Sequence, residues 1–364
     1  MKFTQDLFRY YQTKGMPPAV QGVTLKDQTI LITGANTGLG LEAAKHFARR
    51  DPGRLVMVCR SEERGRGAVE CVAKETGLER DRIELWISDL TSFDSVRSVK
   101  EKIDGLERLD IIVENAGVAM GEYKLTEDGW ETTYVCPITF LLFFVDPTSP
   151  HLTPPSMQVN LLSTALRILL HLPKLIETAS KHPETVPRIV YVSSGSHYSQ
   201  TISKEAIDKD ETVRAVSEDR GEGVKDWTSK RYAESKVLGQ SFMRALQPHL
   251  PTITCVSVGP GFCESDLTRH VTGQQAEAIA KMKEEYAYTS EEGGRQLLYA
   301  AIGERDRESE MRGGWVAFSE ISECSDFLLG EEGKRLEGKV WREVLEVVGG
   351  VDERAREVIE EYLS

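Results

Sequence analysis

A strand, a glycine-rich turn and a helix, joined near the start of the chain, constrain its fold more than any other feature. Residues 28–32 form a short apolar, β-branched run of the kind that makes a buried parallel strand. The run leads directly into Thr33-Gly34-Ala35-Asn36-Thr37-Gly38-Leu39-Gly40, and a helical pattern follows over residues 40–50. Backbone N–H groups at such a helix start can hold a pyrophosphate, and glycine lets the chain turn sharply or approach phosphates closely. The segment predicts a nucleotide site, although the spacing Gly-x-x-x-Gly-x-Gly also fits an ordinary glycine-rich turn.

The rest of the chain alternates strand and helix patterns. Strands are expected near residues 28–33, 54–59, 82–88, 109–114, 188–193, 252–258 and 314–318. Helical patterns lie between them at residues 40–50, 61–76, 93–105, 160–180, 230–247 and 290–303. This alternation predicts a Rossmann-like α/β fold: a doubly wound parallel sheet of seven strands with helices on both faces. A chain of 364 residues, 40% of them hydrophobic, favours one domain with embellishments over two domains.

Tyr232 and Lys236 are four residues apart in a helical pattern, which brings both side chains onto one face. Free tyrosine ionises at roughly pH 10, but a cation within a few ångströms favours the phenolate and lowers the pKa. The pair therefore predicts a phenol that exchanges a proton near neutral pH, as the interconversion of an alcohol and a carbonyl requires. For this spacing alone, the alternative is a surface Tyr and Lys one helical turn apart.

Together these motifs resemble the short-chain dehydrogenase/reductase (SDR) family, whose cofactor motif is Thr-Gly-x-x-x-Gly-x-Gly and whose active-site motif is Tyr-x-x-x-Lys. The resemblance covers residues 26–345 and is strongest to the retinol-dehydrogenase-like branch. It implies a catalytic tetrad of Asn160, Ser194, Tyr232 and Lys236. Taken singly, Asn160 also fits a helix start and Ser194 a turn at a strand end. Found together, the four residues favour an enzyme.

The resemblance also implies which residues contact the cofactor. The glycine turn would hold the pyrophosphate, and an acid after the third strand would lie against the adenine. An Asn-Ala-Gly turn would pack under the cofactor, and a Pro-Gly pair would wall the nicotinamide. The matching positions are Gly34, Asn36, Thr37, Gly38, Leu39, Gly40, Asp89, Leu90, Asn115, Ala116, Gly117, Tyr232, Lys236, Pro260, Gly261 and Ser265.

The end of the second strand bears on the choice between NAD and NADP. An NAD-specific sheet places an acid there to bond the ribose hydroxyls, and that acid would repel a 2′-phosphate. This chain has Cys59 followed by Arg60, whose guanidinium offers paired donors to a phosphate. Arg64 and Arg66 lie near enough in sequence to assist, or face solvent on a helix. NADP(H) is therefore the predicted cofactor.

The mechanism implied by the resemblance is hydride transfer between the nicotinamide and a substrate carbon, with Tyr232 giving or taking the proton. Ser194 would hold the substrate oxygen. Lys236 would lower the pKa of Tyr232, and Asn160 would anchor a water that relays protons. A non-catalytic NAD(P)-binding sensor on the same fold is the alternative function, since fold does not fix function.

Charge and composition exclude several other classes of protein. The chain has 45 Lys and Arg against 58 Asp and Glu, a net charge of −13, and so lacks the basic footprint of a nucleic-acid-binding protein. Its six cysteines form no Cys-x-x-Cys pair, and its seven histidines show no ligand spacing, so no metal site is expected. No signal peptide or membrane span is recognised, which predicts a cytoplasmic protein without membrane contact. A homo-oligomer stays open.

The expected organisation is one SDR domain with additions at both ends. Residues 1–25 form an N-terminal extension, residues 26–345 the domain, and residues 346–364 a helical tail. Residues 195–230 and 266–290 are long connections beside the proposed site, where substrate specificity usually resides. The residues that could line an apolar cleft beside the site, or else pack the bases of these loops, are Tyr198, His197, Trp227, Phe262 and Met282. They favour an apolar alcohol or carbonyl substrate.

Residues 135–157 depart from the family pattern, in which Tyr134 would run directly into Gln158. The segment joins an apolar run over residues 138–145 to a stretch with Pro147, Pro150, Pro154 and Pro155. The run is too short to span a bilayer, which takes roughly 20 residues. Two interpretations remain: a loop that binds a partner or a membrane, or sequence foreign to the fold, such as a retained intron, which we prefer.

Overall fold

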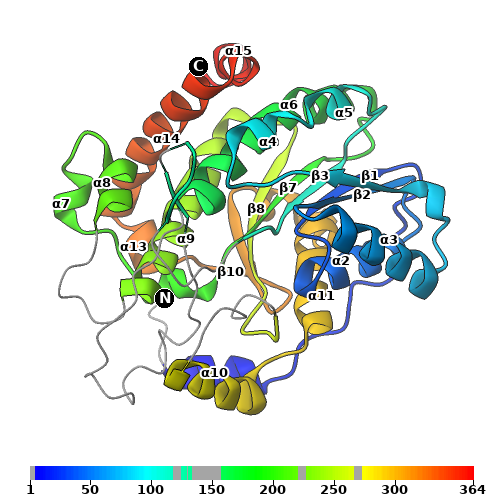
Figure 1. The fold of residues 1–364 in the computed structure, drawn as a ribbon, viewed down its shortest axis with the longest axis horizontal. Coiled ribbons are helices and arrows are strands. Elements are labelled where there is room, and N and C mark those ends of the chain that lie inside the picture. Colours follow the sequence, from blue (N-terminus) through cyan, green and yellow to red (C-terminus); the bar gives the residue numbers. More distant parts are fainter. Residues whose placement is uncertain (1–4, 118–123, 129, 133–156, 220–226, 266–272) are drawn as a thin grey trace.

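A computed structural model describes residues 5–117, 124–128, 130–132, 157–219, 227–265 and 273–364. Its centre is an eight-stranded sheet in the order β10-β9-β8-β7-β4-β1-β2-β3 (Figure 1). The strands are β1 (Thr29–Thr33), β2 (Arg54–Cys59), β3 (Ile83–Ile87), β4 (Ile111–Glu114), β7 (Arg188–Val192), β8 (Thr254–Gly259), β9 (Gly314–Ala317) and β10 (Glu320–Ser322). All neighbours pair in parallel except β9 and β10. The predicted doubly wound α/β fold is confirmed.

The eighth strand corrects the predicted count of seven. β10 returns antiparallel to β9 through a turn formed by Phe318 and Ser319, which both have positive φ, 55° and 54°. Two-residue turns of this kind are normally made by Asn, Asp or Gly, so the Phe-Ser pair gives no hairpin signal. A small separate hairpin, β5 (Lys124–Leu125) with β6 (Glu131–Thr132), was also not expected.

Strand alternation distributes the core over both faces of the sheet. Ile30 and Ile32 point to one face and Leu31 to the other, because successive side chains of a strand point in opposite directions. The first face packs on α2 (Gly38–Ala48), α3 (Glu62–Thr76) and α11 (Ser290–Ile302). The second packs on α4 (Phe93–Arg97), α5 (Lys100–Asp104), α6 (Ser163–Lys181) and α9 (Trp227–Leu246).

The helix that runs over residues 158–181 is a core helix. Its length and hydropathy would allow it to cross a membrane, but 83% of its most apolar window is buried inside the fold. Two further helices, α14 (Glu331–Val351) and α15 (Glu353–Tyr362), cover α9 and α6 from outside (Figure 1). The expected boundary between residues 345 and 346 lies within α14.

Residues 133–156, which hold nearly all of the segment that departs from the family pattern, lie outside the described residues. The residues on either side of the segment are held together. Gln158 donates from Nε2 to Asp128 Oδ2 at 2.6 Å, and its Oε1 accepts from Thr126. β6 contacts the helical turn that begins at Gln158. The last described residues before the segment and the first after it therefore lie at neighbouring points of the fold.

Because these two points are neighbours, we expect a chain without residues 135–157 to fold, with higher thermal stability and soluble yield and with activity kept. Met157 is fully buried, so a matched variant without residues 135–156 keeps its packing. Thermal unfolding, soluble yield and NADPH binding of both variants give the answer. Unfolding of both, or loss of NADPH binding in both, would show that the segment is an integral part of the domain.

Candidate active site

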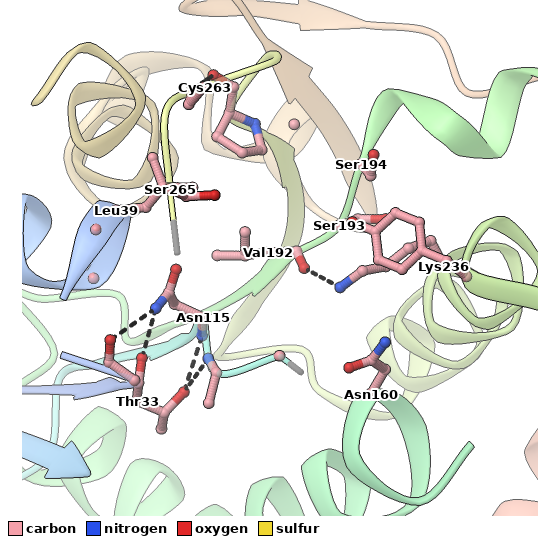
Figure 2. A pocket seen from close by; sticks show the side chains of 18 of the residues that line it. Thr33, Leu39, Asn115, Asn160, Val192, Ser193, Ser194, Lys236, Cys263 and Ser265 are labelled. Carbon is pink, nitrogen blue, oxygen red and sulfur yellow. Dashed lines mark hydrogen bonds between the residues drawn. The ribbon is translucent and has the colours of Figure 1, made fainter. Parts of the chain in front are cut away.

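One pocket contains every residue predicted for the cofactor and the catalytic site. It runs along the carboxyl ends of the parallel strands and crosses the boundary between β1 and β4. The strand order changes direction there: β2 and β3 follow on one side of β1, and β4 lies on its other side. Ligands of open α/β sheets bind at such switch points. Figure 2 shows the side chains that enter the pocket from opposite sides, with Asn115 and Thr33 at one end and Ser194 and Lys236 at the other.

The glycine turn forms the nucleotide end of the pocket. Gly34 and Gly38 have positive φ, 65° and 54°, which glycine adopts without strain. A Cβ on Gly40 would lie 2.3 Å from the carbonyl oxygen of Gly34 and 2.5 Å from Asn115 Nδ2. α2 starts at Gly38, and no side-chain hydrogen bond from Thr37 caps its first turn. The positive end of this helix is thus presented to the pocket, as pyrophosphate binding requires.

Thr33 and Asn115 connect the ends of β1 and β4. Thr33 Oγ1 accepts hydrogen bonds from the backbone N–H groups of Asn115 and Ala116, at 3.0 and 2.8 Å. Asn115 Nδ2 donates to the carbonyl oxygen of Thr33 at 2.8 Å (Figure 2). Beneath them, Glu114 forms a fully buried ion pair with Arg167 of α6, with Nε to Oε1 at 2.9 Å. The sequence analysis did not identify Glu114 or Arg167. The signal that could have indicated this pair was a charged residue, Arg167, within the apolar pattern of residues 160–180.

Arg60 and Asp89 lie beside each other at the end of the pocket near β2 and β3. Arg60 Nε is 4.0 Å from Asp89 Oδ2, and the Arg60 side chain is 46% exposed. Arg64 also lines the pocket. Arg66 does not; it pairs with Glu62 on the exposed face of α3, Nε to Oε1 at 3.1 Å.

Tyr232 and Lys236 project from α9 toward the end of β7. Lys236 Nζ donates to the carbonyl oxygen of Val192 at 2.8 Å and lies 5.6 Å from the centre of the Tyr232 ring (Figure 2). Ser194 is the second residue after β7, and its Oγ accepts from the N–H of Ser196 at 3.1 Å. Tyr232 is 9% exposed and Lys236 6%.

Burial dominates the electrostatics of this pair. It raises the pKa of Tyr232 to about 12, and a side-chain hydrogen bond with Ser194 acts in the lowering direction. It lowers the pKa of Lys236 to about 7, because a charged ammonium is disfavoured away from water. The pKa of Tyr232 thus moves in the opposite direction to the one that the Tyr-Lys spacing predicts. Near neutral pH a large share of Lys236 is uncharged, and an uncharged amine does not stabilise a phenolate.

Asn160 occupies a π-helical turn, Gln158–Leu162, just before α6. Its Nδ2 donates to Ser235 Oγ at 3.2 Å, and its backbone carbonyl accepts from the Tyr191 hydroxyl at 3.2 Å. A Cβ on Gly239 would lie 2.1 Å from that hydroxyl, so glycine is required there. Single π-helical turns inside helices are frequent at functional sites.

The remaining wall comes from the loop after β8. Gly261 has a φ of 83°, and Lys283 Nζ donates to the carbonyl oxygen of Ser265 at 3.1 Å. Of the aromatic residues that the sequence offers for the substrate side, Tyr198 and Phe262 line the pocket. His197 and Met282, also considered, are buried outside it. Phe8, Trp315 and Phe318 line the pocket and were not predicted.

Comparison with known proteins agrees with this geometry. Residues 28–202 match the family model for short chain dehydrogenases. The short-chain dehydrogenase/reductase phmF of Phaeosphaeria nodorum is 30% identical over 344 residues, which cover 94% of this chain and 91% of phmF. The chain belongs to the short-chain dehydrogenase/reductase family. Assignment to the retinol-dehydrogenase-like branch stays a prediction.

Solved structures with the same fold include other SDR-type proteins. Salutaridine reductase from Papaver somniferum aligns with a TM-score of 0.55 at 20% identity, covering 76% of this SDR and 95% of that chain. An Escherichia coli protein solved in complex with NADPH aligns with a TM-score of 0.54 at 21% identity, covering 81% and 97%. At these identities the likeness concerns the fold alone.

Neither metal-ligand clusters nor disulfides occur within the described ranges of this SDR. No three His, Cys, Asp or Glu side chains there are placed to hold a metal ion. Five cysteines in those ranges are free thiols, and four of them are buried.

The lowered pKa of Lys236 predicts a pH-dependent cost to stability. Between pH 7 and the ordinary 10.5, the unfolded chain binds a proton that the folded chain does not, so stability rises with pH there. Lys236→Met should therefore stabilise the fold most below pH 7, and this gain should shrink by up to about 1.4 kcal/mol per pH unit toward pH 10.5. Urea unfolding over this range measures the gain, with Lys100→Met, an exposed lysine at the start of α5, as control. A gain independent of pH would contradict the prediction.

Proposed function

We propose that this SDR is an oxidoreductase that uses NADPH to reduce a ketone or aldehyde to an alcohol, with Tyr232 as the proton donor. The observation that carries the proposal is the shared pocket. Asn160, Ser194, Tyr232 and Lys236 gather at one end of it, and the glycine turn with the start of α2 forms the other. A dinucleotide would extend between these two ends, which would bring its nicotinamide to the four catalytic residues.

The residues present fit a dinucleotide. Gly34 and Gly38 turn the chain with positive φ, Gly40 lets α2 pack directly against Gly34 and Asn115, and the first turn of α2 has no side-chain cap from Thr37. Gly34, Asn36, Thr37, Gly38, Leu39 and Gly40 would hold the pyrophosphate, Asp89 and Leu90 the adenine, Asn115, Ala116 and Gly117 the ribose region, and Pro260, Gly261 and Ser265 the nicotinamide. NADPH supplies a hydride when bound.

The proton comes from Tyr232. With a pKa of about 12, its phenol is protonated at neutral pH and suited to donate to a carbonyl oxygen, which favours reduction over oxidation. Ser194, hydrogen-bonded with Tyr232, would hold the same oxygen. Lys236, whose pKa lies near neutrality, can return a proton to Tyr232 after each turnover. Asn160 would anchor a water that links Lys236 to solvent.

Arg60 supports NADPH over NADH. Its guanidinium lines the pocket beside Arg64, at the end of β2 where an NAD-specific protein places an acid. The E. coli structure with the same fold was solved with NADPH. The substrate would be a small apolar carbonyl compound, and we place the enzyme in the cytoplasm, as a monomer or homo-oligomer.

Replacing the proton donor tests the mechanism. Tyr232→Phe should leave NADPH affinity nearly unchanged and lower kcat by orders of magnitude, because only a transition-state interaction is removed. The measurement is NADPH oxidation against a panel of ketones and aldehydes, with NADPH binding in parallel. Tyr299→Phe, a buried tyrosine outside the pocket, is the matched control. Turnover that survives in Tyr232→Phe would remove Tyr232 from this role.

Removing the guanidinium tests the cofactor. Arg60→Ala should weaken NADPH binding more than NADH binding by about 1.5 kcal/mol, the low end for a charge-assisted contact, because the side chain is nearly half exposed. Arg66→Ala, on the same side of the sheet but outside the pocket, should change neither NADPH binding nor NADH binding. Titrations of both cofactors measure the difference. Equal losses for NADPH and NADH would show that Arg60 does not read the 2′-phosphate.

A further inference from the structure

The N-terminal helix α1 (Gln5–Thr13) is fastened to the wall of the pocket by one side chain. Gln12 is 7% exposed, and its Nε2 donates to the carbonyl oxygens of Phe262 and Tyr286 at 2.9 and 2.8 Å. Its Oε1 accepts from the N–H of Phe262 at 3.0 Å. All polar atoms of one buried amide thus bond to segments about 250 residues away in the chain. The helix lies against α10 (Gly273–Tyr286) in Figure 1.

The same helix also contacts the turn between β9 and β10. The Tyr11 ring stacks on the Phe318 ring, with centroids 4.4 Å apart and planes 8° from parallel. The carbonyl oxygen of Tyr11 accepts from the Tyr288 hydroxyl. α1 therefore links the loop after β8 to the β9–β10 turn, two elements that border the pocket.

Phe318 is held in a backbone conformation that is costly for its residue type. Its φ of 55° lies in the left-handed region, which a bulky side chain rarely adopts. Gln296 fixes the turn, accepting from the N–H of Ser319 at 2.7 Å and donating to its Oγ at 3.0 Å. Such strain persists only where the surroundings impose it, and it concentrates at functional sites. Here it places an aromatic ring at the pocket.

Five aromatic side chains line the pocket, and we call them the aromatic wall: Phe8, Tyr198, Phe262, Trp315 and Phe318. Phe8 and Phe262 are 6.3 Å apart, and Tyr198 meets Trp315 edge-on at 6.2 Å. Tyr198 lies four residues after Ser194 and Phe262 two after Pro260, so the wall adjoins the proposed reacting centre. Aromatic faces and edges pair favourably with other aromatic rings.

We infer that the aromatic wall binds planar aromatic carbonyl compounds, and that α1 is a specificity-determining element that supplies Phe8 and positions Phe262 and Phe318. This inference rests on the proposed function for its catalytic readout, but its binding readout is independent of turnover. A planar ring system can lie against the phenyl faces of the wall, whereas a globular aliphatic molecule of similar polarity gains only ordinary burial.

Two 1,2-diketones separate these cases: 9,10-phenanthrenequinone, which is planar and aromatic, and camphorquinone, which is aliphatic and cage-shaped. Binding of each is followed by quenching of tryptophan fluorescence, since Trp315 lines the pocket, and turnover by NADPH oxidation. Phe8→Leu should raise Kd and KM for phenanthrenequinone about three- to tenfold, the measure of a lost aromatic pair, and should raise those for camphorquinone less. The matched control is Tyr10→Leu, which also replaces an aromatic ring by leucine on the same helix, but at a side chain that is 57% exposed.

Gln12→Glu tests the positioning role of α1. A carboxylate would face two carbonyl oxygens at 2.9 and 2.8 Å, so α1 should detach and produce the same selective loss of phenanthrenequinone binding as Phe8→Leu. Thermal unfolding and NADPH affinity show whether the variant is folded. The conservative variant Gln12→Asn, which keeps the amide chemistry on a shorter side chain, should recover part of the loss.

The outcomes are distinct for the two proposals. Equal Kd and KM values for phenanthrenequinone in Phe8→Leu and Tyr10→Leu would overturn the inference and leave the oxidoreductase function intact. An equal loss of binding for both diketones in Phe8→Leu would do the same. Selective loss of phenanthrenequinone binding without NADPH oxidation by the unmodified enzyme would support the aromatic wall and count against the proposed function.

Discussion

The hydroxyl of Thr33 is the point on which both halves of the pocket depend. It accepts the N–H groups of Asn115 and Ala116 and donates to Glu114 Oε2 at 3.3 Å, so it joins the ends of β1 and β4. Glu114 continues the connection through its buried ion pair to Arg167 of α6, the helix that follows the Asn160 turn. On the other side, Gly40 packs against Asn115 closely enough to exclude any side chain. A single chain of contacts therefore fixes the start of α2 relative to the Asn160 turn. Loss of one partner would leave a buried charge or donor unsatisfied, which is costly.

Burial sets the proton chemistry at the other end. The same packing that holds Tyr232 and Lys236 in place removes water from both, which raises the pKa of the phenol to about 12 and lowers that of the amine to about 7. At neutral pH the phenol is consequently uncharged, and a large share of the lysine is uncharged too. A neutral phenol can donate to a carbonyl oxygen, and a lysine that titrates near pH 7 can exchange protons readily in both directions. These protonation states are the ones that the proposed reduction would require.

The sequence predicted the elements whose signals are local. The glycine turn, each strand run and the Tyr232–Lys236 pair each consist of residues that are close together in the sequence. The structure places the strands in one α/β sheet, and the glycine turn and the Tyr232–Lys236 pair in one pocket. Three features could not be predicted, for physical reasons. β10 depends on a left-handed Phe-Ser turn that its own residues disfavour. The direction of the Tyr232 pKa shift depends on tertiary burial, which helical spacing does not reveal. Gln12 acts through partners that are 250 and 274 residues away.

The predicted and the unpredicted features lie largely at different ends of the pocket. The nucleotide end is built from residues that follow strands closely, so its motifs are short and contiguous in the sequence. The substrate end is assembled from α1, the loop after β8 and the β9–β10 turn, which meet only in the folded chain. Changes in any of these three elements can reshape the substrate wall without disturbing Thr33, Gly40 or Asn115. Because the sheet fixes the nucleotide end, divergence at the other end carries little cost to the fold. If the proposed function holds, specificity would therefore depend on contacts between segments remote in sequence, with the N-terminal helix among them.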